Sequence, residues 1–92
     1  MNEVSVEQDP LQALVWFKRA ADHGHPLAQY NTALKYYNGA GMKQNLDESI
    51  RYAEMAVRNG NPPAKALLYD IYAESSSLKY SPEKANYWKS KL

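Results

Sequence analysis

The sequence repeats itself every 36 residues. Trp16, Tyr52 and Trp88 share one repeat position, and Gly24 and Gly60 share another. A period of this length is typical of solenoids built from helix pairs, in which each unit packs on its neighbours. With 92 residues the chain has room for one domain. The repeat divides this domain into a partial unit at residues 1–26 and units at 27–62 and 63–92.

Cap residues divide each unit into two helices. Asp9, Asn45 and Ser81 suit helix N-caps, because their side chains accept hydrogen bonds from the free amides of a first turn. Gln12 and Glu48 follow their caps by three residues, as in a capping box. A glycine, followed two residues later by proline, separates the helices of neighbouring units. We predict helices over residues 10–22, 27–38, 46–58, 63–74 and 82–91.

Composition argues against several classes of partner. The formal net charge is +1, with 23% charged residues of both signs. Such a chain has no strong field to attract phosphate backbones or anionic lipid, so we expect no nucleic-acid and no membrane partner. No cysteine is present, which is consistent with a reducing compartment.

The N-terminal residues do not resemble a signal peptide. No basic run is followed by an apolar stretch there, and no apolar stretch in the chain is long enough to cross a bilayer. We therefore expect a cytoplasmic location. A chain trimmed after export would have the same appearance.

An apolar stripe predicts the core. Residues 13, 16, 17, 20 and 21 and their equivalents 36 residues later lie on one helical face. Trp16 and Trp88 are therefore expected in the core as packing wedges, with ligand stacking as the alternative. On this assignment Trp16→Ala would cost about 3–5 kcal/mol of stability.

Two segments follow a known repeat pattern. Residues 28–45 read Ala-Gln-Tyr-Asn-Thr-Ala-Leu-Lys-Tyr-Tyr-Asn-Gly-Ala-Gly-Met-Lys-Gln-Asn, and residues 16–24 read Trp-Phe-Lys-Arg-Ala-Ala-Asp-His-Gly. These segments resemble the Sel1-like repeat, a relative of the tetratricopeptide repeat, over nearly the whole chain. Thr32 and Ala33 depart from the Leu-Gly of that pattern. In the second unit, serines at 75–77 replace its Gly-x-Gly loop.

The resemblance implies a fold and a class of activity. The implied fold is all-α, an αα-hairpin solenoid of about five helices wound as a right-handed superhelix. The implied activity is protein–protein contact without catalysis, as in adaptors, scaffolds, bacterial host-interaction factors and toxin-neutralising proteins. In such arrays the first helix of each pair lines the concave face. Here these would be the helices at 27–38 and 63–74.

A candidate binding face follows from that mapping. Leu27, Tyr30, Leu34 and Tyr37 recur at helical spacing and share one face. One unit later, small and acidic residues occupy the equivalent positions. Our candidate partner-binding residues are Leu27, Tyr30, Leu34, Tyr37, Asn38, Asp70 and Glu74.

We assign these residues two roles. Tyr30, Leu34 and Tyr37 would anchor an apolar or aromatic element of a partner, while Asp70 and Glu74 would meet a basic group. The alternative is that the side chains of these three anchor residues pack internally on the helix containing Trp16, or cover an interface left by a missing upstream repeat.

Other chemistry has little support in the sequence. His23 and His25 have no companions at metal-ligand spacing, so we predict no metal site. The serines at 75–77 lack a nucleophile elbow, and Gly39 and Gly41 lack the rest of a phosphate-binding motif. We predict no catalytic residue, no cofactor and no enzyme activity.

The leading hypothesis is a protein-interaction module or adaptor that binds a protein or peptide in its concave groove. We expect a monomer or weak self-association. Two alternatives stay open: a bacterial immunity protein that neutralises a toxin, and a structural, self-associating fragment of a longer repeat array.

Overall fold

The computed structural model describes residues 9–39 and 43–92. Over these residues the chain forms helices and no strands, which confirms the all-α prediction. Ala40, Gly41 and Met42 of the predicted loop lie outside the described residues. The helices are α1 (Pro10–Asp22), α2 (Pro26–Asn38), α3 (Leu46–Arg58), α4 (Pro63–Ala73) and α5 (Pro82–Lys89).

Three predicted helix boundaries need correction. α2 begins at Pro26, one residue early, because proline suits the first helical position. α4 ends at Ala73, and Glu74 follows as its C-cap in an extended conformation. α5 ends at Lys89, with Ser90 as its cap, so it is two residues shorter than predicted.

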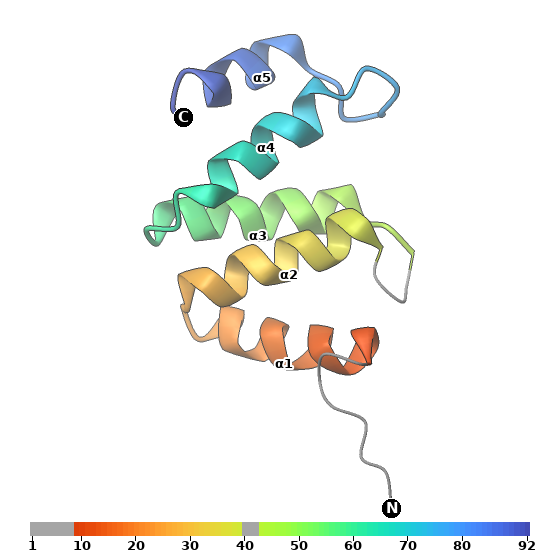
Figure 1. The fold of residues 1–92 in the computed structure, drawn as a ribbon, viewed down its shortest axis with the longest axis vertical. Helices are drawn as coiled ribbons and strands as arrows, with labels where there is room; N and C mark the ends of the chain where they lie inside the picture. The colour runs from red at the N-terminus through yellow and green to blue at the C-terminus, as the bar shows by residue number, and fades with distance from the viewer. Residues whose placement is uncertain (1–8, 40–42) are drawn as a thin grey trace, which may run out of the picture.

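The helices stack one after another, with α1 and α5 at opposite ends (Figure 1). The molecule is 52 Å along its longest axis and 16 Å along its shortest. Each helix packs on its sequence neighbours, and α2 also contacts α4. The short turns from α1 to α2 and from α3 to α4 lie on one side, and the two longer loops lie on the other. None of the described helices combines the length and apolarity needed to cross a membrane.

The predicted N-caps are confirmed. Asp9 Oδ1 accepts hydrogen bonds from the amides of Leu11 and Gln12, each at 3.2 Å. The equivalent cap atoms of α3 and α5 accept from the amide three residues later, at 3.0 Å and 3.3 Å. The starts of α1, α3 and α5 are therefore set by local side-chain chemistry.

The capping box predicted for α3 is only half formed. Asn45 caps Glu48, but the Glu48 carboxylate binds Arg51 rather than the Asn45 amide. That amide donates instead to the carbonyl oxygen of Tyr36 at 3.0 Å. The equivalent bond one unit later runs from Ser81 to Tyr72 at 2.9 Å. Asn45 and Ser81 are thus each tied to the preceding helix.

Tyr52 lies at the centre of the core. Its side chain is fully buried and its ring stacks on that of Tyr36, with centroids 6.1 Å apart. Small side chains beside it, such as Ala53 and Ala56, are also fully buried and let neighbouring helices approach closely. Tyr52 therefore fills the role predicted for the repeated aromatic position.

Trp16 contradicts the same prediction. It occupies the position of Tyr52 in α1, yet it is 50% exposed. The reason is its place in the stack: α3 packs between α2 and α4, whereas α1, among the described helices, packs on α2. Trp88 is partly buried against the core. The repeat position shared by Trp16, Tyr52 and Trp88 is thus half exposed in α1, fully buried in α3 and partly buried in α5.

Candidate functional site

The candidate residues of α2 are supported from beneath. Tyr30, Leu34 and Tyr37 are partly buried and pack against the hydrophobic core, while Leu27 and Asn38 are exposed. Each of these three side chains therefore packs on the core with part of its surface and is exposed over the rest.

The candidate residues of α4 are more open. Asp70 is exposed on the helix, and Glu74 is exposed at its C-terminal end. The two residues are separated along the chain by about one helical turn. The helices that carry the two sets of candidate residues, α2 and α4, contact each other across the stack. We call Leu27, Tyr30, Leu34, Tyr37, Asn38, Asp70 and Glu74 the α2/α4 face.

A pocket of about 430 Å³ opens where α2 and α4 end. Two residues of the α2/α4 face, Tyr37 and Glu74, line it; the other five do not. The pocket therefore joins residues from consecutive repeat units. Its described lining residues are Tyr37, Gln44, Leu46, Ile71, Glu74, Ser76, Ser77 and Leu78.

Hydrogen bonds shape the wall of the pocket. Gln44 Nε2 donates to the carbonyl oxygen of Tyr37 at 2.7 Å, which ties the loop before α3 to the end of α2. Glu74 Oε1 accepts from the amide and the hydroxyl of Ser76, at 3.3 Å and 2.9 Å. The carboxylate is thereby oriented while its residue stays exposed.

Sequence reasoning missed most of the pocket. Ile71 is a core residue, and Leu46 begins α3, so neither belongs to the exposed stripe of a concave helix. In the sequence, Leu78 could have indicated the pocket. It occupies an apolar repeat position shared with Val6 and Met42, which lie outside the described residues, yet its own side chain is fully exposed beside the pocket.

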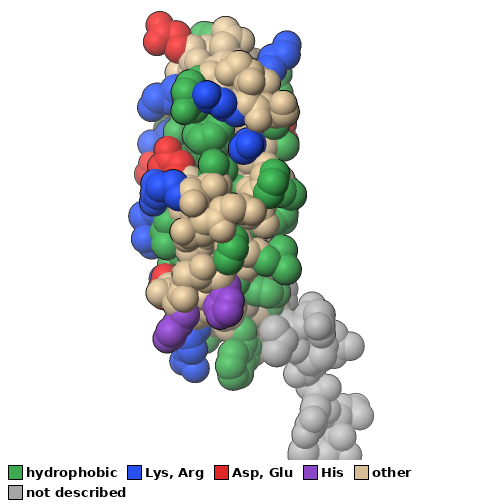
Figure 2. Space-filling model, turned by 90° about the vertical axis from the view of Figure 1, so that its left-hand side faces the viewer, with side chains coloured by type: hydrophobic (Ala, Val, Ile, Leu, Met, Phe, Trp, Pro, Cys, Tyr) green, Lys and Arg blue, Asp and Glu red, His purple; other side chains and the backbone are tan. Residues whose placement is uncertain are grey.

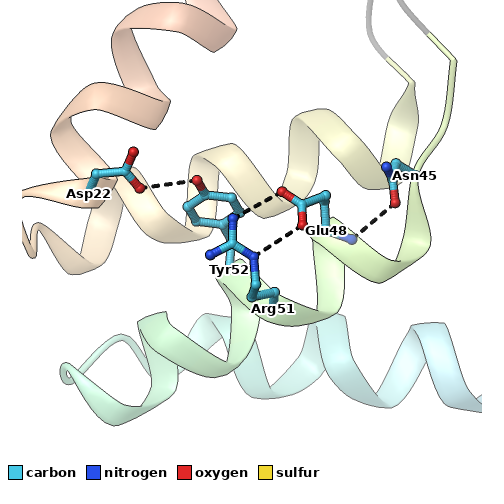
Figure 3. Close-up of polar contacts among 5 residues, drawn as sticks. All are labelled: Asp22, Asn45, Glu48, Arg51 and Tyr52. Atoms are coloured by element: carbon cyan, nitrogen blue, oxygen red, sulfur yellow. Dashed lines mark hydrogen bonds and ion pairs between the residues drawn. The ribbon is translucent and has the colours of Figure 1, made fainter.

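A separate polar network joins α1 to α3. Figure 3 shows the Tyr52 hydroxyl directed at Asp22, and Arg51 directed at Glu48. The hydroxyl donates to Asp22 Oδ1 at 3.1 Å, and Arg51 binds both carboxylate oxygens of Glu48, at 3.1 Å and 3.0 Å. The Arg51 guanidinium also lies 4.5 Å from the Tyr52 ring centre.

The pKa shifts of this network reflect packing and pairing. Burial, together with the bond to Asp22, raises the pKa of Tyr52. The hydrogen bonds from Arg51 lower the pKa of Glu48. The bond from Tyr52 to Asp22 joins α1 to α3, so we interpret the network as structural support for the stack.

The histidines show no sign of a metal site. His23 caps the end of α1, where its Nδ1 lies 2.8 Å from the carbonyl oxygen of Arg19. Over residues 9–39 and 43–92, no three His, Asp or Glu side chains gather in a way that could hold a metal ion. His23 is thus a helix-end residue, as its sequence position indicates.

The side of the molecule with the short turns has two unlike edges. Figure 2 shows hydrophobic side chains along one edge over the middle and lower part, and most of the acidic and basic side chains toward the opposite edge. The histidines lie near the lower end of this view. On this side of the stack, apolar and charged side chains therefore gather at opposite edges.

A stack of paired helices in 36-residue units, with a pocket shared by consecutive units, defines an αα-repeat solenoid. Within this class the chain belongs to the Sel1 repeat family. The sequence model of the Sel1 repeat matches residues 3–25 and 26–61, more than half of the chain. Sel1 repeats are generally protein–protein interaction modules, and proteins of the family are typically non-catalytic scaffolds.

A solved structure supports the same assignment. The crystal structure of a Sel1 repeat protein from Oxalobacter formigenes matches this chain with a TM-score of 0.74 and 31% sequence identity. The match covers 91% of this chain and 34% of that protein, so the chain spans about a third of its length. A comparison with curated protein sequences found no match.

Proposed function

We propose that this chain is a non-catalytic adaptor that binds a protein or peptide along the α2/α4 face. The observation that carries the proposal is the pocket, because Tyr37 of one unit and Glu74 of the next line it together. A ligand lying along this face would contact two units at once. Solenoids usually bind their partners on such a surface, which successive repeats build together.

The packing of the α2 anchors favours binding. Tyr30, Leu34 and Tyr37 rest on the core, so their conformations are restricted before a partner arrives. Less side-chain entropy is then lost on association. Tyrosine adds a large contact area with a polar tip, which is common at interface hot spots.

Peptide selection tests this proposal without a known partner. Displayed random peptides would be selected on the wild-type chain, and their affinities measured for a Tyr30→Ala, Tyr37→Ala double variant. We expect at least about a tenfold loss, as for hot-spot tyrosines. Tyr87→Ala is the matched control, since Tyr87 is an exposed tyrosine on α5, outside the face.

A second substitution separates binding from folding. Tyr30 and Tyr37 contribute to packing, so their removal also lowers stability. Leu27 is 63% exposed, and Leu27→Asp leaves the core intact while placing a charge on the face. Selected peptides that bind the double variant, Leu27→Asp and wild type equally would show that the partner does not use this face.

Self-association is the second candidate function, and the outer surface of α1 favours it. Leu11, Val15 and Trp16 are each about half exposed there. In α3 the positions equivalent to Leu11 and Val15 are Asp47 and Arg51, so the repeat itself does not require apolar residues. We propose that two copies meet through this surface, each covering the apolar side chains of the other.

Sedimentation at increasing concentration tests the second candidate. We expect a reversible dimer for wild type and a monomer for Val15→Glu, which places a charge on the apolar surface. Lys84→Glu, on exposed α5, is the control and should leave dimerisation unchanged. A wild-type chain that stays monomeric at millimolar concentration would exclude this candidate.

A further inference from the structure

The end of α4 differs electrostatically from the ends of the other described helices. Each of those carries a basic residue in its last turn: Arg19, Lys35, Arg58 or Lys89. α4 carries none. A helix C-terminus has partial negative charge, which a basic residue offsets. This favourable charge is missing at the end of α4.

Acidic residues increase the imbalance. Asp70 lies in the last turn of α4, and Glu74 is its C-cap. In α2 the equivalent positions hold Leu34 and Asn38, so the fold of a unit does not need these carboxylates. Carboxylates near a helix C-terminus repel its partial charge. They therefore lower local stability unless a cation approaches them.

The neighbouring lysine does not provide that cation. Lys79, in the loop after α4, forms its ion pair with Asp47 at the start of α3. Glu74 is held by Ser76, a neutral partner. Among the described residues that line the pocket, Glu74 is the only charged one.

The rest of the pocket suits a long cationic side chain. Tyr37 provides an aromatic wall, and Leu46, Ile71 and Leu78 provide apolar contact for a methylene stem. The C-terminal end of α4, with no basic residue in its last turn, adds negative potential at the same place. A planar guanidinium combines stacking on an aromatic ring with hydrogen bonds to a carboxylate, which an ammonium does less well.

We propose that this pocket binds an arginine side chain of the partner, with Glu74 as its counter-ion. The inference rests on the proposed function, and it names the chemistry recognised at one end of the α2/α4 face. Tyr30 and Leu34 contact the apolar part of the ligand, and the arginine enters the pocket beyond Tyr37.

A pair of small probes tests the pocket alone. Nα-acetyl-arginine amide and Nα-acetyl-citrulline amide have similar shapes but differ in charge. Titrated into the labelled chain and followed by NMR, arginine should bind at least about fivefold more tightly than citrulline. The amide signals of the pocket residues should shift, and the preference should shrink as salt is added.

Two matched variants assign the effect. Glu74→Gln keeps an acceptor for Ser76 but removes the charge, and should abolish the preference for arginine. Glu83→Gln makes the same charge change at an exposed position of α5, outside the pocket and the α2/α4 face, and should preserve it. Thermal melts of both variants report whether the fold is intact.

The outcomes separate the two proposals. Equal binding of arginine and citrulline, or equal effects of the two variants, would overturn the arginine pocket. If selected peptides lose affinity with the tyrosine variants but not with Glu74→Gln, binding along the α2/α4 face is supported and the arginine pocket is contradicted. If they need Glu74 but tolerate loss of Tyr30, the arginine pocket is supported and binding along the α2/α4 face is contradicted.

Discussion

Two residues at one repeat position have opposite environments. Tyr52 is fully buried between helices, whereas Trp16 is half exposed on α1. We expect Tyr52→Ala to lower the free energy of unfolding by about 3–5 kcal/mol and Trp16→Ala by about 1 kcal/mol, because the latter loses much less buried area. Denaturant titrations measure both losses. Equal losses would contradict the burial difference.

Tyrosine burial also predicts a dependence on alkaline pH. The pKa of Tyr52 is raised above its ordinary value of 10.0 by burial and by Asp22, and burial likewise raises the pKa of Tyr72. The unfolded chain therefore loses these protons first as the pH rises. Stability is fully present below about pH 10 and declines above it.

Tyr52→Phe tests the contribution of one hydroxyl to that decline. At neutral pH we expect a loss of about 1 kcal/mol, because the hydrogen bond to Asp22 disappears. Above about pH 10 the variant should lose stability less steeply than wild type. Melting temperatures across this range provide the measurement. Parallel curves would mean that Tyr52 does not titrate differently in the two states.

At the scale of elements, the turns between helices depend on backbone conformation. Gly24 and Gly60 have φ of 91° and 96°, and an added Cβ would meet nothing within 4 Å at either position. The cost of Gly60→Ala therefore comes from the backbone alone, and we expect about 1 kcal/mol. Gly60→Asn should cost less, since asparagine tolerates positive φ better. A melt with no loss for alanine would contradict this.

Helix boundaries were largely predictable because their causes are local. The caps at Asp9, Asn45 and Ser81 act on amides two or three residues away. The ends of α4 and α5 were less predictable. No glycine follows α4, and the loop after Glu74 is organised by its own serines, so the repeat pattern has no equivalent stop there.

At the scale of the whole molecule, Gln29 joins two turns. Its side chain is buried, its Nε2 donates to the Ala21 carbonyl, and its Oε1 accepts from Asn59, each at 3.0 Å. Gln29→Leu should therefore cost about 1–3 kcal/mol, because the hydrogen bonds of the buried Gln29 side chain to Ala21 and Asn59 are lost. Gln12→Leu, at an exposed position, is the control and should be nearly neutral in denaturant titrations.

The binding surface also belongs to this scale. Sequence spacing placed Tyr30, Leu34 and Tyr37 on one face, and family resemblance indicated which helices share it. Neither identified the pocket. Its walls come from the ends of two helices and the loops between them, and their meeting depends on how successive units are rotated.

The sequence by itself determined the helices, the 36-residue unit and the membership of a repeat family, because caps, turns and hydrophobic period act over short distances. Only the tertiary structure decided that Tyr52 is core while Trp16 is exposed, and that Tyr37 and Glu74 share a pocket. Burial depends on which neighbours a helix has in the stack. Equivalent positions in a repeat therefore have equal local structure but unequal surroundings.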